Sequence, residues 1–192
     1  MTTDPQLAAL REGDDAAVSA LFERYADRIY RLADGLLRDA AEAEDVVQES
    51  FVKALKNLDR FEGRAGIGTW LYRVAYNTAM DRLRKRGRAT LAYDEGDVPL
   101  PHTLVDWSST PEEQLLDSEA RAALAAAADT LSAPLRAVFI LRDVDGLSTA
   151  EAAEALEISE SAAKVRLHRA RLQLRERLSE YFSERLTEGE PT

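Results

Sequence analysis

Residues 147–177, LSTAEAAEALEISESAAKVRLHRARLQLRER, restrict the fold of this chain more than any other stretch. Ser148 stands where a helix N-cap would, and Glu151 follows it at the spacing of a capping box, so a short helix with a small-residue face is expected to begin there. The segment EIS interrupts that helix, and its last residue, Ser159, is placed to cap a second, longer helix. A small-faced helix, a tight turn and a basic second helix together predict a helix-turn-helix, whose second helix enters the DNA major groove.

The second helix carries the side chains that would touch DNA. At about 100° per residue, its basic side chains at 164, 168, 171 and 175 fall within about 40° of one another. The short side chains at its start would approach base edges, and the long basic ones would reach phosphates or guanine. A solvated basic helix in a bundle is the simpler interpretation, but the order of capped helix, turn and basic helix favours DNA binding. The candidate DNA-contacting residues are Ser161, Ala162, Lys164, Arg166, His168, Arg169 and Arg171.

The composition predicts an all-α protein, because alanine, leucine, arginine and glutamate dominate while β-branched and aromatic residues are few. At 192 residues the chain is long enough for one domain or two small ones. It has no cysteine, its two histidines lie in unrelated contexts, and it has no phosphate loop or nucleophile with a histidine partner. No metal, cofactor or enzymatic activity is therefore expected. The polar start and the lack of a run of about 18 apolar residues predict a cytoplasmic protein.

Charge is sorted along the chain. The formal net charge is −10, which taken alone disfavours nucleic acid, because phosphate contacts dominate that affinity. Residues 82–88, however, hold five basic residues and no acidic one, and residues 164–177 hold six basic residues and one acidic one. Between them, residues 89–120 contain eight acidic residues and no lysine or arginine. The two basic segments therefore stay candidates for DNA contact despite the acidic total.

The N-terminal part of the chain predicts a helical stretch over residues 4–37, interrupted at Gly13. Apolar residues from Val18 to Leu37, with Phe22 among them, recur at spacings of three and four. This spacing marks a single buried face and indicates a packing helix.

A second helix is predicted over residues 39–58. Its apolar face includes Phe51, whereas Asp45, Gln48 and Glu49 lie away from that face. Paired carboxylates can bind metal or transfer protons, but no histidine or further ligand accompanies these two. An ordinary solvated face and a partner-docking surface both remain open.

Residues 61–68, FEGRAGIG, predict a loop, because three glycines in eight residues break a helix. Thr69 is expected to cap the next helix, over residues 70–86. One face of that helix combines aromatic, amide and basic side chains, which suits single-stranded DNA, since bases stack on rings while basic groups hold phosphates. A core helix with a solvated basic end is an equal alternative. The candidate residues are Phe61, Arg64, Ala65, Trp70, Arg73, Asn77, Arg84 and Lys85.

Residues 91–117 predict an acidic, flexible linker, because they hold three prolines and show poor periodicity. Residues 1–90 and 118–186 would then form two small helical domains, followed by a polar tail at 187–192. In the second domain Pro134 starts a helix, and about four helices are expected, of which the helix-turn-helix provides the last two.

Three blocks of this sequence resemble the extracytoplasmic-function sigma factors, which are two-domain bacterial initiation factors. The blocks are EDVVQESFVKAL, DRFEGRAGIGTWLYRVAYNTAMDRLRKR and LRAVFILRDVDGLSTAEAAEALEISESAAKVRLHRARLQLRERL. They cover roughly residues 16–88 and 118–178, in the order of that family and with an acidic linker between them. The resemblance implies a region-2 helical bundle, a region-4 helix-turn-helix domain and promoter-specific initiation with core RNA polymerase.

The resemblance also implies roles for the candidate residues. Asp45, Gln48, Glu49 and Phe51 would dock on the clamp helices of the polymerase β′ subunit. The candidates between Phe61 and Lys85 would capture and hold the melted −10 element, with Asn77 contacting a base. The helix-turn-helix candidates would read the −35 element, and their domain would touch the β flap. An anti-sigma factor that covers the polymerase-docking surfaces is also implied.

The sequence departs from the family at several positions. Glu157 stands where glycine is usual in the turn, and Ala162 and Ala163 stand where larger residues are common. Contacts to the −35 element would therefore be fewer or different. A stand-alone helix-turn-helix regulator is the alternative function; it would bind an operator without polymerase and would need neither of the first two blocks.

Overall fold

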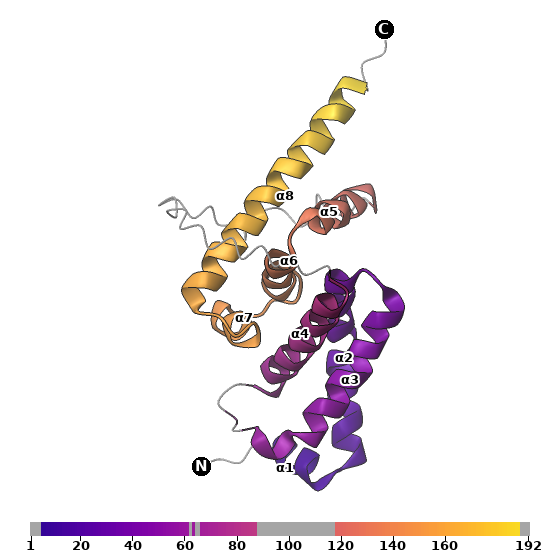
Figure 1. Ribbon diagram of the computed structural model, residues 1–192, viewed down its shortest axis with the longest axis vertical. Coiled ribbons are helices and arrows are strands. Elements are labelled where there is room, and N and C mark those ends of the chain that lie inside the picture. The colour runs from indigo at the N-terminus through magenta and orange to yellow at the C-terminus, as the bar shows by residue number, and fades with distance from the viewer. Residues whose placement is uncertain (1–4, 62, 64–65, 88–117, 189–192) are drawn as a thin grey trace.

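The computed structural model describes residues 5–61, 63, 66–87 and 118–188, and within these residues it contains helices and no strand (Figure 1). The all-α prediction is confirmed. The linker predicted at residues 91–117 lies outside the described residues, as do residues 189–192 of the predicted tail. None of the described helices is long and apolar enough to cross a lipid bilayer.

The N-terminal helices begin where the sequence provides caps. The Asp14 side chain accepts the N–H groups of Ala16 at 2.7 Å and Ala17 at 3.2 Å, and the Asp39 side chain accepts the N–H of Glu42 at 3.0 Å. These three bonds satisfy backbone donors that a helix leaves open at its start. The elements in order are α1 (Pro5–Glu12), α2 (Asp15–Leu37), α3 (Ala40–Lys56), the 3-10 turn η1 (Leu58–Arg60) and α4 (Ile67–Lys85).

Helix α4 begins earlier than its sequence predicts. Gly66 occupies the N-cap without a side-chain hydrogen bond, and Thr69 lies inside the helix with 5% exposure, so the predicted Thr69 cap is wrong. The cause is packing against α2. A Cβ at Gly68 would lie 2.5 Å from the Tyr25 hydroxyl, so the glycine lets the first turn of α4 lie directly on that ring.

The C-terminal helices contain the predicted helix-turn-helix. The Ser148 hydroxyl accepts the N–H of Glu151 at 3.2 Å, and the Glu151 carboxylate accepts the N–H of Ser148 at 2.7 Å, which completes a capping box. Ser159 accepts the N–H of Ala162 at 3.1 Å and caps the second helix. The elements are α5 (Ser118–Thr130), α6 (Ala133–Phe139), the π-helical turn η4 (Ile140–Val144), α7 (Thr149–Ala155) and α8 (Glu160–Glu188).

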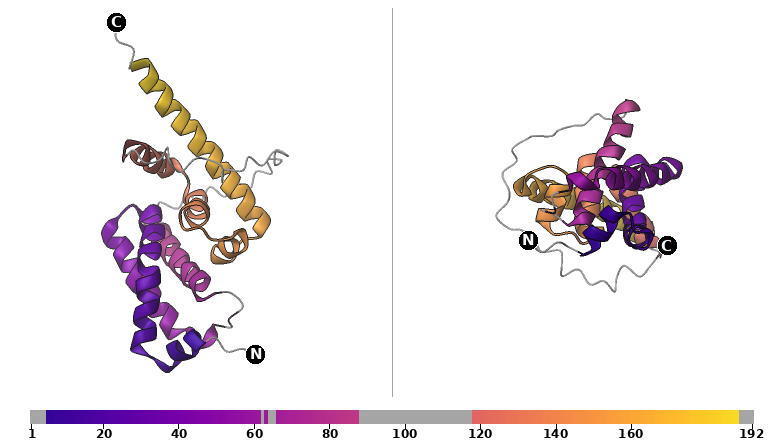
Figure 2. Two further views of the ribbon diagram at one scale, coloured as in Figure 1. Left: turned by 180° about the vertical axis from the view of Figure 1, so that it is seen from behind. Right: turned by 90° about the horizontal axis from the view of Figure 1, so that it is seen from below.

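Helix α8 is longer than a helix-turn-helix requires. Its first half packs on α6 and α7, and its second half projects away from the rest of the molecule in the left view of Figure 2. A small buried cluster joins α5 to α8 through Ala127, Leu131, Ala170 and Leu174. The last residues of α8 include positions that had been assigned to the polar tail.

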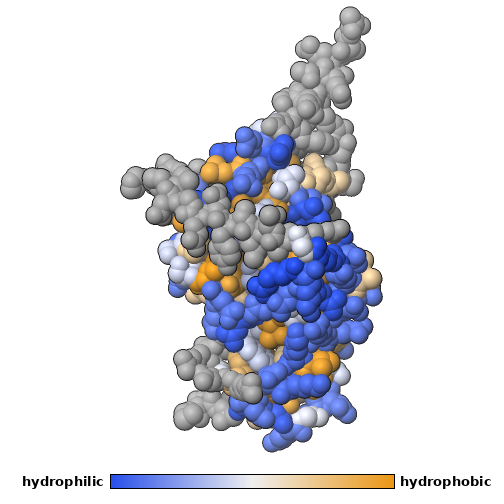
Figure 3. All heavy atoms as spheres, in the orientation of Figure 1, coloured by the Kyte–Doolittle hydropathy of each residue, from blue (hydrophilic) through white to orange (hydrophobic). Residues whose placement is uncertain are grey.

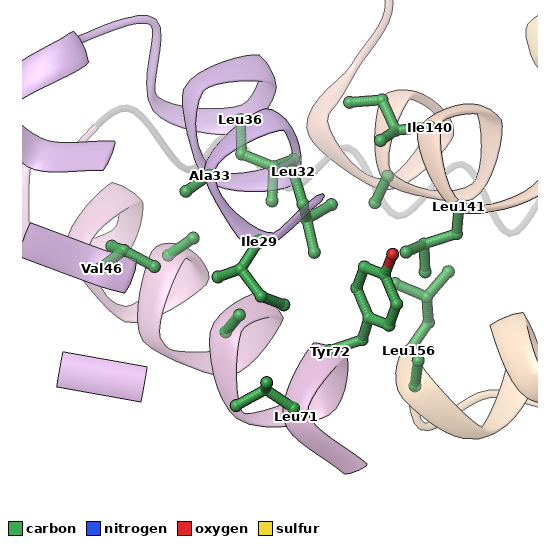
Figure 4. Packing of buried hydrophobic residues seen from close by; sticks show 14 of the residues in the cluster. Ile29, Leu32, Ala33, Leu36, Val46, Leu71, Tyr72, Ile140, Leu141 and Leu156 are labelled. Atoms are coloured by element: carbon green, nitrogen blue, oxygen red, sulfur yellow. The ribbon is translucent and has the colours of Figure 1, made fainter. Parts of the chain in front are cut away.

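One continuous apolar core connects the N-terminal and C-terminal helices. Ile29 of α2 and Tyr72 of α4 are buried in the same cluster as Leu141 of η4 and Leu156 at the end of α7 (Figure 4). The α4 and α7 helices lie side by side across this junction. On the outside, hydrophilic residues cover most of the described surface in the view of Figure 3, and only small apolar patches interrupt them.

Candidate nucleic-acid and partner interfaces

The acidic face predicted on α3 is present, and a basic residue of α4 reaches it. Asp45 and Gln48 are exposed. Arg82 contacts Asp45 at 3.3 Å and Glu49 at 2.9 Å, and Lys53 contacts Glu49 at 2.8 Å. Hydrogen bonds from Lys53 and then Arg82 lower the pKa of Glu49, and the bond to Glu49 raises the pKa of Arg82. Glu49 therefore stays ionised at neutral pH, and the face is suited to a partner with complementary polar or basic groups.

Phe51, the fourth residue of the predicted docking set, lies in the core with 5% exposure, as its place on the apolar face predicted. Its ring packs on Phe22 with the centroids 4.8 Å apart. Phe22, placed on the buried face by its spacing, is 46% exposed, so that prediction is wrong. The large exposed apolar side chains of α2 and α3 are thus Phe22 and Val52, which is 50% exposed.

The loop before α4 is anchored by two aromatic rings that pack on each other at a tilt. Phe61 and Trp70 have centroids 5.1 Å apart and are 7% and 9% exposed. Arg11 donates a hydrogen bond of 2.8 Å to the carbonyl oxygen of Phe61 and ties this point to α1. Both rings therefore shape the base of the loop. Arg64 and Ala65, the other loop candidates, lie outside the described residues.

A hollow of about 450 Å³ between α3 and α4 brings together three of the predicted −10 residues, Trp70, Arg73 and Asn77. Its wall combines an apolar ring, a guanidinium group and an amide, which is the mixture that holds an unstacked base and its phosphate. Arg84 and Lys85 are exposed at the far end of α4, where Arg84 pairs with its helical neighbour Asp81.

Asn77 also contacts the other domain. Its side-chain nitrogen donates to a Glu157 carboxylate oxygen at 2.8 Å. Glu157 lies in the turn of the helix-turn-helix and has a positive φ of 55°. A second hollow of about 220 Å³ lies beside this bond, with Tyr76 and Arg84 on one side and Leu156 on the other. The turn is therefore a contact to α4 as well as a connection between α7 and α8.

The predicted −35 residues all lie on the first part of α8, but they differ in exposure. Ser161 and Lys164 are exposed, and Ala162, Arg166, His168 and Arg169 are half-buried. Arg171 makes a bidentate ion pair with Asp143 of η4, at 2.9 Å and 2.7 Å, so it also braces α8 against its own domain. The neighbouring Ala163, 1% exposed, faces the core.

A buried carboxylate, that of Asp145, lies between the domains. The Asp145 side chain is fully buried. It accepts a hydrogen bond of 2.9 Å from the Tyr72 hydroxyl and two from Arg31, at 3.1 Å and 2.7 Å. Burial, and then the nearby Asp145 charge, raise the pKa of Tyr72. No sequence signal could have found this group, because its partners lie 73 and 114 residues away along the chain.

Within the part of the chain that the structure describes, no cluster of three or more histidine, cysteine or acidic side chains could hold a metal ion.

Two family models match the chain. The model of sigma-70 region 2 matches residues 21–89, and the model of sigma-70 region 4 matches residues 121–174. The chain is 32% identical over 183 residues to the ECF RNA polymerase sigma factor SigW of Bacillus subtilis, covering 93% of this chain and 97% of that protein. It is 35% identical over 178 residues to the ECF RNA polymerase sigma factor SigE of Mycolicibacterium smegmatis, covering 90% of this chain and 66% of that protein.

Two solved structures resemble the fold. CnrH in complex with the cytosolic domain of CnrY superposes with a TM-score of 0.64 at 26% identity, over 91% of this chain and 95% of CnrH. The sigma factor RpoE in complex with the anti-sigma factor NepR, from Bartonella quintana, superposes with a TM-score of 0.62 at 27% identity. The match covers 84% of this chain and 96% of the matched chain.

Proposed function

The chain belongs to the extracytoplasmic-function sigma factors of bacterial RNA polymerase, and we propose that it directs core polymerase to promoters through the surfaces described above. The observation that carries this proposal is their combination in one chain: an ionised acidic face on α3, an aromatic and basic hollow beside α4, and a capped helix-turn-helix. A stand-alone operator-binding regulator would need only the last of these. In this proposal the present chain has a regulatory role in the cytoplasm, where polymerase works, and requires no cofactor.

The acidic face of α3 is the polymerase-docking surface in this proposal. Asp45, Gln48 and Glu49 would contact the clamp helices of the β′ subunit. Phe51 would support them from the core, while Phe22 would add an exposed apolar contact.

The loop and α4 would hold the melted −10 element. The packed rings of Phe61 and Trp70 would set the shape of the loop that receives a flipped base, and Arg64 and Ala65 of the same loop are further proposed contacts. Asn77 would read a base edge through its amide. Basic side chains would hold the phosphates beside it; they are Arg73, Arg84 and Lys85.

The helix-turn-helix would read the −35 element from the start of α8. The exposed Ser161 and Lys164 are best placed to reach DNA, and the half-buried Arg166 and Arg169 flank them. The same domain would contact the polymerase β flap. Ala162, His168 and Arg171 complete the proposed surface.

Regulation by an anti-sigma factor is part of the proposal. One of the two similar solved structures is a sigma factor bound to an anti-sigma factor, and the other is bound to the cytosolic domain of a second protein. We extend this to a partner of the present chain that covers its polymerase-docking surfaces.

Run-off transcription with purified core polymerase on a promoter library tests the function. The chain should direct initiation at a defined subset of sequences, and initiation at none of them would refute the proposal. Lys164→Ala should weaken initiation that depends on the −35 sequence, whereas Asn77→Ala should alter the preference at −10. Gln173→Ala, at an exposed position of the same helix outside the proposed surface, is the matched control for Lys164→Ala.

A further inference from the structure

We propose that Arg82 of α4 is a positioning residue of the polymerase-docking surface, which holds the carboxylates of Asp45 and Glu49 in one arrangement on α3. Arg82 lies in the basic segment 82–88, which the sequence leaves as a candidate for DNA contact. In this proposal it acts on polymerase binding through the two acids and contacts no promoter DNA. The inference rests on the proposed function, because it concerns the docking role of the same acidic face.

The basic end of α4 contains two groups of side chains. Arg82 and Arg86 are four positions apart, which places them about 40° from each other around the helix. Both side chains reach α3 or its cap: Arg82 contacts the two docking acids, and Arg86 contacts Asp39 at 3.5 Å as well as Glu42. The two arginines therefore form one row of ion pairs between α4 and the N-terminal part of α3.

Arg84 and Lys85 lie outside this row. The Arg84 side chain is 54% exposed and pairs with Asp81 of its own helix, whereas the Arg82 side chain is 25% exposed. Lys85 is also exposed. The promoter phosphates are thus left to Arg84 and Lys85, while Arg82 is engaged with α3.

A single guanidinium group spans the two docking acids. Its Nη1 lies 3.3 Å from Oδ2 of Asp45, and its Nη2 lies 2.9 Å from Oε2 of Glu49. The other oxygen of Glu49, Oε1, lies 2.8 Å from Nζ of Lys53, and the same amine donates to the Thr78 hydroxyl of α4 at 3.2 Å. Glu49 is therefore held through both of its oxygens, while the Asp45 side chain remains 63% exposed to a partner.

Arg82 supplies what the two acids lack by themselves. Asp45 and Glu49 stand one turn apart on α3, and like charges at this spacing repel each other. The planar fork of arginine can bind two carboxylates at once, which the single amine of lysine does less well. A partner that meets carboxylates already fixed in place immobilises fewer side chains on binding. Arg82 should therefore strengthen docking, even though its positive charge reduces the net negative charge of the face.

The sign of the effect separates positioning from competition. If Arg82 only neutralised the acids, its removal would free them for basic groups of polymerase and would tighten binding. If Arg82 positions the acids, its removal weakens binding, because polymerase must then order two mobile side chains. The affinity for core polymerase therefore decides between the two roles.

Arg82→Gln and Arg82→Lys test the inference, with Lys56→Gln as the matched control. Lys56 is exposed in the last turn of α3 and belongs to none of the proposed surfaces, so its variant changes the net charge as Arg82→Gln does. Fluorescence anisotropy of the labelled full chain gives the Kd for core polymerase, and circular dichroism checks that each variant is folded. Arg82→Gln should bind about tenfold more weakly, Arg82→Lys should recover only part of the loss, and Lys56→Gln should stay within about twofold of the wild type.

The same substitution in a chain that already carries Asp45→Asn and Glu49→Gln shows whether Arg82 acts through these acids. There Arg82→Gln should cause no further loss of affinity, whereas a general role in packing α4 on α3 would weaken binding equally in both backgrounds. Unchanged or tighter binding of Arg82→Gln, full recovery with lysine, or the same loss in both backgrounds would overturn the inference.

Run-off transcription at a fixed amount of core polymerase separates docking from promoter contact. With rising concentrations of the chain, Arg82→Gln should reach the wild-type level of transcript, whereas Arg84→Gln should stay below it, because Arg84 is proposed to hold a promoter phosphate. An Arg82→Gln variant that stays low at saturation would be a promoter contact and would contradict the inference. A wild type that does not bind core polymerase would instead refute the proposed function, so the two failures are distinguishable.

Discussion

Replacing Gly35 with alanine tests the domain contact at a single atom. Within α2 the change should be favourable by about 0.5–1 kcal/mol, because glycine loses more backbone freedom than alanine in a helix. Across the contact, however, the new Cβ would lie 2.5 Å from Cδ1 of Ile140, far inside van der Waals distance. Overpacking of this kind costs about 1–3 kcal/mol. We therefore expect Gly35→Ala to weaken the contact between the two domains by roughly 1–2 kcal/mol and to expand the chain.

Ile140→Val supplies the compensating change, since valine lacks the one atom that would clash. The next nearest atom of Ile140, Cγ1, lies 3.9 Å from the Cβ position, which is an ordinary contact. The single variant Ile140→Val should cost about 0.5–1.5 kcal/mol, because it leaves a small void. In the double variant the new methyl group fills that void. The two changes should therefore be coupled favourably, by about 1–2 kcal/mol.

The test compares four proteins: the wild type, Gly35→Ala, Ile140→Val and the double variant. Urea denaturation followed by circular dichroism gives the free energy of unfolding of each, and small-angle scattering gives its compactness. The double variant should recover both the compact scattering profile and most of the lost free energy of unfolding. Additive effects of the two substitutions, or a compact and stabilised Gly35→Ala protein, would refute the argument that Gly35 serves the close approach of the domains.

Two further predictions concern hydrogen bonds with opposite pH dependence. Ser148→Ala should lower the free energy of unfolding by about 1 kcal/mol in urea denaturation. Hydrogen bonds from the Ser148 side chain and then from its backbone N–H lower the pKa of Glu151, so their contribution is present above its ordinary value of 4.5 and is lost as the pH falls below it. The variant keeps the backbone N–H and should therefore show a smaller decline. Tyr72 behaves in the opposite sense, because its pKa is raised in the folded protein. Its bond to Asp145 should hold below pH 10 and weaken above it, so the wild type should expand at high pH in small-angle scattering. Tyr72→Phe, which lacks the hydroxyl group, should not show this pH-dependent expansion.

The local elements of the fold could be predicted because their causes are local. The caps at Asp14, Asp39 and Ser159 and the capping box at Ser148 lie within three residues of the backbone groups that they satisfy. The helix-turn-helix follows from two such caps and a short interruption. The candidate promoter-reading residues Arg73 and Asn77 are brought into one hollow for the same reason, since helical spacing alone places them on one face.

The predictions that failed depended on which neighbour a helix meets. Helical spacing grouped Phe22 with the buried face of α2, but in the assembled bundle that ring covers Phe51 from outside. Thr69 looked like a cap because the three glycines before it suggested a loop. Packing of Gly68 on Tyr25 instead draws the start of α4 back to Ile67.

The sequence by itself determined the helices, most of their caps, the sorting of charge and the family, because each depends on residues close together in the chain or on a linear pattern. The tertiary structure alone decided that the two domains share a core and that Asp145 lies buried between Arg31 and Tyr72. It also decided that Asn77 is bonded to Glu157. Such contacts join residues far apart in the chain. Burial of their apolar groups stabilises them, and hydrogen bonds offset the cost of burying the charged groups. No single segment carries that information, so the contact between the two domains is visible only in the tertiary structure.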